Sequence, residues 1–198
     1  VGIGAAENST TGSNFVAVGR EALNNQTTGD NNVAVGLNSG ANVTTGTGNT
    51  LLGSSAGSGT TTANNNTAVG NSAFISNQTG TENTYLGAYS GNANTGSYNV
   101  GIGSSVLQLS GAGSYNTAVG NSALNALTSG VGNTGCGRSA LNAITTGGDN
   151  VAVGKEALSS NTTASNNTAL GKSALNANTT GSSNTGVGYQ ALYTNTTG

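Results

Sequence analysis

Apolar positions recur along the chain at a nearly fixed interval, and each one immediately precedes a glycine. Ile102, Val119 and Val153 occupy this position, and the residue two places earlier is Val or Thr in every unit. A period of two, in residue types that favour strands, predicts a short β-strand with one buried face. In the unit at 151–153 we therefore expect Val151 and Val153 to point inward.

The glycines that follow these strands divide the chain into similar units. Successive anchor glycines such as Gly137 and Gly154 are 17 residues apart. The anchors are Gly4, Gly19, Gly36, Gly53, Gly70, Gly87, Gly103, Gly120, Gly137, Gly154, Gly171 and Gly188. A period this regular is typical of a repeat architecture. We interpret residues 1–198 as a single repeat array and as a segment of a longer fibre.

This array predicts an all-β fold, a parallel β-solenoid (β-roll) of about twelve 17-residue coils. One coil has too little aliphatic surface to offset the roughly 1.5 kcal/mol per residue that ordering costs, so the coils must stack. The small residues at the centre of the strands, such as Gly135 and Ala152, favour the close approach of a neighbouring chain. We therefore expect a homotrimer.

A leucine column lies in the second half of most units. Its members are Leu107, Leu124, Leu141, Leu158, Leu175 and Leu192. Adjacent apolar residues point to opposite sides of a straight strand, so Ala157-Leu158 predicts either a bend or a single helical turn. Burial of the leucine within one chain or between chains is left open. Gly40, Gly57 and Gly91 replace leucine, which predicts a less well specified N-terminal half.

An asparagine column precedes the strands. Its members are Asn32, Asn49, Asn66, Asn83, Asn99, Asn116, Asn133, Asn150, Asn167 and Asn184. Stacked coils would place these side chains about 4.8 Å apart, so each amide can donate to the carbonyl of the next coil and form a ladder. The alternative is a solvated turn asparagine that tolerates unusual backbone angles.

The composition narrows the chemistry. The chain has four basic and six acidic residues and a net charge of -2, which gives too few cations for a nucleic-acid surface. It contains no long apolar run for membrane insertion, no His, and only scattered carboxylates, so no acid–base pair is indicated. We expect no catalytic, cofactor-binding or metal-binding residue and no enzyme activity. We expect Cys136 to be a small core residue without a disulfide.

One column is charged. Arg138, Lys155 and Lys172 follow the anchor glycine in successive coils. Coils about 4.8 Å apart would bring like charges together, so we expect these side chains to point to solvent, with Glu156 offsetting them. The pattern favours a solubilising edge, and the alternative is a binding stripe for an anionic glycan.

Triplets of the form Asn-x-Ser/Thr are possible glycosylation sites. They begin at Asn8, Asn25, Asn42, Asn65, Asn77, Asn161, Asn166, Asn178 and Asn195. Turns rich in Asn and Thr also generate such triplets by chance, which is the interpretation we favour. Threonine-rich coils also raise an ice-binding solenoid as a minor alternative, although the paired threonines are adjacent and point to opposite sides.

The units Asn-Thr-Ala-Val-Gly-Asn-Ser-Ala-Leu at 116–124 and Asn-Thr-Gly-Val-Gly-Tyr-Gln-Ala-Leu at 184–192 resemble the head repeats of YadA-like trimeric autotransporter adhesins. They resemble the repeats of phage-type tail-fibre proteins more closely still. The resemblance covers the whole chain and implies a trimeric attachment fibre that is extracellular, on a cell surface or on a virion.

We therefore expect a non-catalytic adhesin head or spacer whose partners are further copies of itself and cell-surface glycans. The competing hypothesis is an extracellular filament subunit that stacks end to end.

Overall fold

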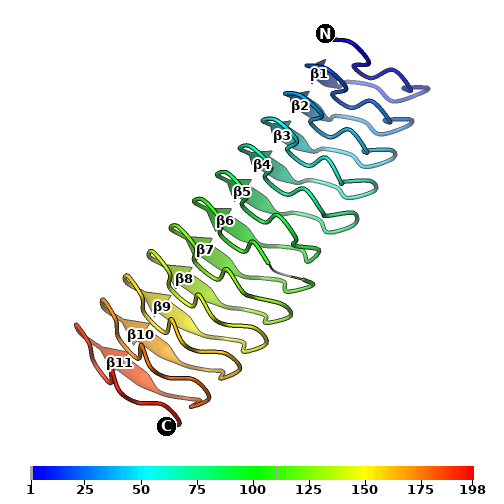
Figure 1. Cartoon of the computed structure of the whole chain (residues 1–198). Helices are drawn as coiled ribbons and strands as arrows, with labels where there is room; N and C mark the ends of the chain where they lie inside the picture. Colours follow the sequence, from blue (N-terminus) through cyan, green and yellow to red (C-terminus); the bar gives the residue numbers. More distant parts are fainter. Residues whose placement is uncertain (1, 110) are drawn as a thin grey trace.

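The computed structural model describes residues 2–109 and 111–198, and this part of the chain forms one long rod of stacked coils (Figure 1). It contains eleven three-residue strands: β1 (Val16–Val18), β2 (Val33–Val35), β3 (Thr50–Leu52), β4 (Thr67–Val69), β5 (Thr84–Leu86), β6 (Val100–Ile102), β7 (Thr117–Val119), β8 (Thr134–Cys136), β9 (Val151–Val153), β10 (Thr168–Leu170) and β11 (Thr185–Val187). They form one parallel sheet in sequence order. The predicted β-solenoid is therefore confirmed.

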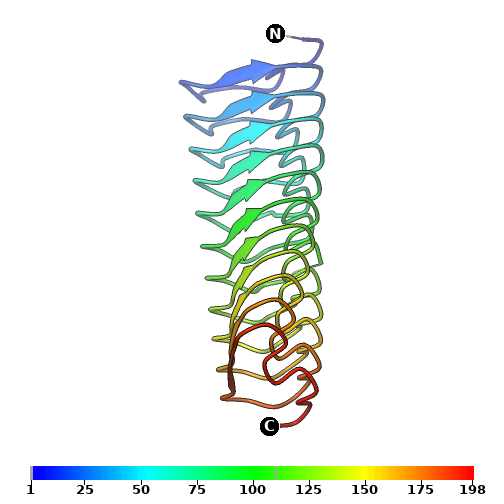
Figure 2. The same cartoon turned by 90° about the vertical axis from the view of Figure 1, so that its left-hand side faces the viewer.

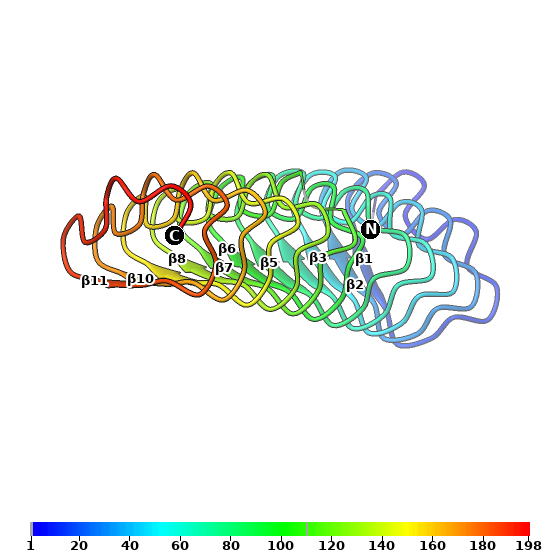
Figure 3. The same cartoon turned by 90° about the horizontal axis from the view of Figure 1, so that it is seen from below.

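Each strand pairs in register with the strand one coil away, so equivalent residues of successive units lie side by side. Val33 of β2 pairs with Thr50 of β3, and Thr134 of β8 pairs with Val151 of β9. The sheet forms one side of the rod and the turns form the other (Figures 2 and 3). Within the described residues the unit around Gly4 contributes no strand, so eleven strands stand where about twelve coils were expected.

The prediction of which strand face is buried was wrong. In β9 the central Ala152 is fully buried, whereas Val151 is 39% exposed. The same pattern, with a buried centre, holds from β2 to β11. The reason is the small width of the coil. A Cβ built on Gly135, at the centre of β8, would collide with Cδ1 of Leu124 on the opposite wall, so the inward face accepts mainly small residues.

The Ala-Leu pair lies on a bend, which decides between the two alternatives left open by the sequence. Ala123 and Leu124 are both fully buried. Ser122 and Leu124 have positive φ values of 58° and 48°, and the described part of the chain contains no helix. Alternate left-handed residues turn the chain so that neighbouring side chains both point inward. The leucines therefore belong to the core of one chain, except Leu192 on the last coil, which is half-exposed.

In the N-terminal half, side chains from the strands occupy the space beside the glycines that replace leucine. Where Gly57 replaces leucine, Leu51 extends from β3, and its Cδ2 lies 2.6 Å from the position of a Cβ on Gly57. Where Gly91 replaces leucine, ring atoms of Tyr85 from β5 lie 2.6 Å from the position of a Cβ on Gly91. Tyr85 also contacts the ring of Phe74, with centroids 5.1 Å apart. Large residues on the strand thus fill the space that the turn leaves empty.

The anchor glycines allow the coils to approach each other closely. Gly154 has φ +131°, and a Cβ there would lie 2.5 Å from the carbonyl oxygen of Gly171 in the next coil. The glycines of the closing Thr-Thr-Gly turns play a different role from the expected one. Gly147 does not have a positive φ, and its missing side chain instead gives room to the carbonyl of Ala164.

Candidate functional surfaces

The asparagine column forms a buried ladder along the rod. Nδ2 of Asn150 donates to Oδ1 of Asn133 at 3.0 Å, and the backbone N–H of Asn150 donates to the same oxygen at 3.1 Å. The amide also donates to the carbonyl of Ala164 at 2.9 Å. Equivalent side-chain bonds of 3.0–3.2 Å join each consecutive pair from Asn32 to Asn167. From Asn49 to Asn167 each amide therefore donates to the preceding coil, and burial excludes a solvated turn asparagine there. Asn184, on the last coil, is half-buried and donates to Asn167 through its backbone N–H only.

A second row of hydrogen bonds runs along the closing turns and was not anticipated from the sequence. The hydroxyl of Thr145 donates to the carbonyl of Thr162 at 3.0 Å, and that of Thr162 donates to the carbonyl of Thr179 at 3.3 Å. The second threonine of the pair, Thr146, is exposed. The sequence did contain a sign of this row, because the first threonine of each pair recurs at one position of the repeat.

Burial divides the candidate glycosylation sites. Asn77, Asn161 and Asn178 are fully buried, and Oδ1 of Asn161 accepts from the backbone N–H of Ala164 at 3.0 Å. A glycan on these three is incompatible with the folded coil. The other six, which stay predictions, are exposed or half-buried: Asn8, Asn25, Asn42, Asn65, Asn166 and Asn195.

The outward face of the sheet is aliphatic in one column, carries Val and Thr in the other, and is exposed or half-buried. We call it the aliphatic face and define it by the first and third residues of β1–β11. Its third-residue column contains only Val, Leu, Ile and Cys136, and its first-residue column contains only Val and Thr. Cys136 is free and exposed on this face, so the prediction that it is a core residue was wrong.

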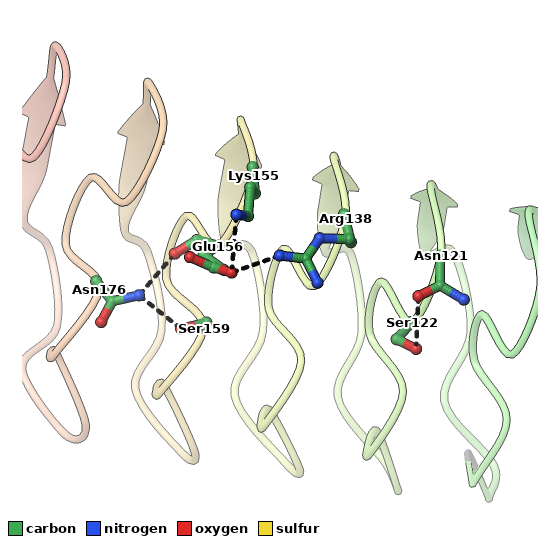
Figure 4. Close-up of polar contacts among 7 residues, drawn as sticks. All are labelled: Asn121, Ser122, Arg138, Lys155, Glu156, Ser159 and Asn176. Atoms are coloured by element: carbon green, nitrogen blue, oxygen red, sulfur yellow. Dashed lines mark hydrogen bonds and ion pairs between the residues drawn. The ribbon is translucent and has the colours of Figure 1, made fainter.

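The charged column points to solvent, as expected, and Glu156 lies between two of its members (Figure 4). Nη2 of Arg138 lies 2.9 Å and Nζ of Lys155 lies 3.5 Å from Oε1 of Glu156. Lys172 instead lies over the ring of Tyr189, 5.4 Å from its centroid. These exposed contacts relieve the repulsion between like charges along the column.

Two further tyrosines form a feature that sequence reasoning missed. Tyr98 and Tyr115 occupy the position just before the ladder asparagine in successive coils, and both are exposed. Their rings stack with centroids 4.9 Å apart and planes 5° apart. The two tyrosines share one position of the repeat, which the sequence shows. That their rings stack became apparent only once the register between coils was known.

The remaining carboxylates are distributed along the rod. The described residues enclose no pocket and contain no cluster of three potential metal ligands. Hydrogen bonds from the backbone and hydroxyl of Ser13 lower the pKa of Asp30. In the same part of the chain, no helix has the length and apolar character needed to cross a membrane.

Comparisons with protein-family models, with curated proteins and with solved structures give no match for this chain.

Proposed function

We propose that the chain is a rigid structural rod that associates side by side with copies of itself into an attachment fibre or spacer. In this proposal the fibre is non-catalytic and works outside the cell, on a cell surface or a virion. The observation that carries the proposal is the aliphatic face, an apolar surface that one chain leaves uncovered.

The extent of this face supports association. Ten steps of about 4.8 Å between β1 and β11 make it about 48 Å long. Monomeric soluble proteins rarely expose a continuous apolar surface larger than a few hundred square ångströms. No charged residue occupies either column of the face, and depletion of charge is characteristic of the centre of protein interfaces.

A parallel homotrimer suits both the face and the resemblance to trimeric adhesin heads and tail fibres. Rotation about an axis parallel to the rods keeps all chains pointing the same way, as a fibre requires, and closes the assembly. Each chain then turns its aliphatic face toward the axis. The Ala and Leu columns take no part in this interface, because they are buried within each chain.

The proposed attachment role rests on what remains outside such a bundle. The turns expose hydroxyl and amide side chains, such as those of Thr146 and Asn166. These groups both donate and accept hydrogen bonds, which suits them to cell-surface glycans.

A matched pair of lysine variants tests the interface. Ile102→Lys places a charge on the aliphatic face, whereas Ser104→Lys, in the same coil, places it in the column that already holds Lys155 and Lys172. Light scattering coupled to size exclusion should give three times 18.9 kDa for the parent chain and for Ser104→Lys, but a monomer for Ile102→Lys. A parent chain that is monomeric at micromolar concentration would refute the proposal.

Cys136 provides an independent test, because it is the chain's single cysteine and lies on the aliphatic face. A bulky maleimide should react slowly with the assembled parent chain and rapidly with Ile102→Lys. Equal reaction rates would contradict burial of this face in the assembly.

Two other functions have an observation in their favour. The in-register backbone pairing that joins one coil to the next also suits coils of separate chains, which favours end-to-end filaments. Electron microscopy separates long uniform filaments from discrete short rods.

The aliphatic face also carries regularly spaced threonines, including Thr50, Thr67 and Thr84, each two residues before an aliphatic residue. Regular rows on an exposed face favour the ice-binding alternative more than the paired threonines do. A parent chain that is monomeric and shows thermal hysteresis would support this alternative, and a monomeric parent chain without hysteresis would exclude it.

A further inference from the structure

Tyr98 and Tyr115 adopt a backbone conformation that bulky residues rarely adopt. Both have positive φ, 60° and 59°. At the same repeat position other coils carry residues that tolerate this conformation better, such as Asn65, Gly132 and Asn166. Left-handed residues recur in every coil, but at this position an exposed tyrosine is less favourable for folding than asparagine or glycine.

The column continues with an empty position and then a carboxylate. In coil order it reads Glu82, Tyr98, Tyr115, Gly132 and Asp149. Gly132 has no side chain to cover the outer side of the Tyr115 ring, which is 61% exposed. Oδ1 of Asp149 lies 2.5 Å from the position of a Cβ on Gly132, so this carboxylate reaches the level of the empty coil, one coil spacing from Tyr115.

The two carboxylates of this column have no partner of their own. Within residues 2–109 and 111–198, neither Glu82 nor Asp149 makes a side-chain hydrogen bond or ion pair, whereas Glu21 and Glu156 each lie near a cation. The column therefore presents stacked ring faces between two unpaired negative charges. Ring faces and carboxylates both attract cations.

We propose that Tyr115, Gly132 and Asp149 form a binding site for a guanidinium group, with Tyr98 supporting the first ring. The planar cation lies above Gly132, stacks on Tyr115 and donates two parallel hydrogen bonds to the carboxylate of Asp149. The chain already uses the same chemistry between adjacent coils, where Lys172 covers the ring of Tyr189. This inference does not depend on the proposed fibre function.

Charge decides the ligand class. An anionic sugar or phosphate would meet the repulsion of Asp149 and Glu82. A neutral sugar could stack on the ring, but it would leave the two negative charges uncompensated. A guanidinium group can stack on the ring and pair with the carboxylate at the same time. Its two parallel N–H donors match a carboxylate better than an ammonium group does.

A titration of the full chain with N-acetyl-arginine amide, followed by the NMR shifts of the tyrosine rings and nearby amides, tests the site. We expect saturable shifts confined to this column, weaker binding of N-acetyl-lysine amide by about threefold, and weaker binding at high salt. Asp149→Asn should weaken the binding of the arginine probe by about fivefold or more.

A matched pair of glycine variants separates the site from general surface effects. Gly132→Asn fills the empty position with a residue that the column accommodates elsewhere, and it should abolish the shifts. Gly48→Asn makes the same change at the equivalent glycine, where Oδ1 of Asn65 lies 2.5 Å from the Cβ position and no tyrosine is adjacent, and it should leave binding unchanged.

Three outcomes would overturn the inference: no saturable shift with the arginine probe, equal binding by Gly132→Asn and the parent chain, or tighter binding of a neutral sugar such as maltotriose. Unfolding midpoints of all variants, measured alongside, should match the parent closely enough that a folding defect cannot account for lost binding.

Discussion

Different coils of the rod fill the same interior from opposite walls. In the C-terminal half the turn supplies the large residue, such as Leu124, and the facing strand supplies a small one, such as Gly135. Around β3 and β5 the order is reversed, with Leu51 and Tyr85 on the strands opposite Gly57 and Gly91. What is conserved from coil to coil is the filled volume, and either wall can supply it.

Filling the interior from the turn and filling it from the strand differ in the free-energy cost of the backbone conformation on the turn. Leu141 occupies left-handed backbone with φ 51°, which costs a non-glycine residue about 1 kcal/mol. Gly91 adopts φ 59° without that strain, but glycine loses more conformational entropy when the chain folds. A glycine in the leucine column therefore does not by itself leave a gap, because a large residue on a strand can fill the space.

Removing the largest strand residue should have the greatest effect. Tyr85→Ala leaves a cavity opposite Gly91, where no turn side chain can fill it, and should reduce the free energy of unfolding by about 4 kcal/mol. Urea denaturation followed by circular dichroism measures the change. The exposed Tyr115→Ala is the control and should change stability by less than about 0.5 kcal/mol. A loss below about 1 kcal/mol for Tyr85→Ala would mean that the N-terminal half is loosely packed after all.

The asparagine ladder should be equally important in both halves. Asn49 and Asn133 each accept two hydrogen bonds from the following asparagine and donate to the preceding one. Replacing either by alanine leaves buried groups unpaired and should cost about 3 kcal/mol. The two losses, measured by the same denaturation, should agree within about 0.5 kcal/mol. Clearly unequal losses would show that the halves differ in more than their packing.

Exchanging the two packing solutions tests the comparison directly. Gly135→Leu alone collides with Leu124 and should cost about 2 kcal/mol. Adding Leu124→Gly removes the collision, as Gly40 gives room to Leu51 in the N-terminal half, and should restore at least half of the loss. A coupling energy of about 1 kcal/mol or more in the double-mutant cycle is expected. Purely additive losses would contradict the view that volume is shared between the walls.

The smallest effect should be a gain in stability. The hydroxyl of Tyr85 is buried without a hydrogen-bond partner among the described residues, so Tyr85→Phe should stabilise the fold by about 1 kcal/mol.

Burial also raises the pKa of Tyr85, so in the folded chain the phenol stays protonated at a pH where the unfolded chain ionises. The parent chain should therefore lose stability as the pH rises above about 10, the ordinary tyrosine pKa. The Phe variant should lack this part of the loss. Parallel pH profiles for the two chains would argue against a buried, protonated phenol.

The stacked architecture could be predicted because each of its features depends on one residue type that recurs at one position of the repeat. The recurrence of anchors such as Gly120 and Gly137 gives the coil length, and Asn116 and Asn133 at one phase give the ladder. Parallel in-register pairing follows, because only that arrangement brings identical positions together.

The inside and outside of the strand could not be predicted from residue types alone. Hydrophobicity favours Val151 over Ala152 as the buried residue, but the width of the coil decides the opposite. That width depends on alternate left-handed residues such as Ser122 and Leu124, a conformation that leucine rarely adopts and that no propensity encodes. The same inversion explains why Cys136 lies outside.

The candidate surfaces were predictable to different degrees. The exposed charged column follows from simple repulsion between Arg138, Lys155 and Lys172. The tyrosine stack and the space beside it do not, because Tyr115, Gly132 and Asp149 look unrelated until the register places them in adjacent coils.

The identical bonding of every coil to the next has a mechanical consequence. Hydrogen bonds such as those from Asn150 to Asn133 run along the rod axis, so a pull on the chain ends loads the coils one after another. Each 17-residue coil that detaches frees about 58 Å of extended chain. A single rod under tension should therefore lengthen in equal steps, and each step should dissipate mechanical work as one coil detaches.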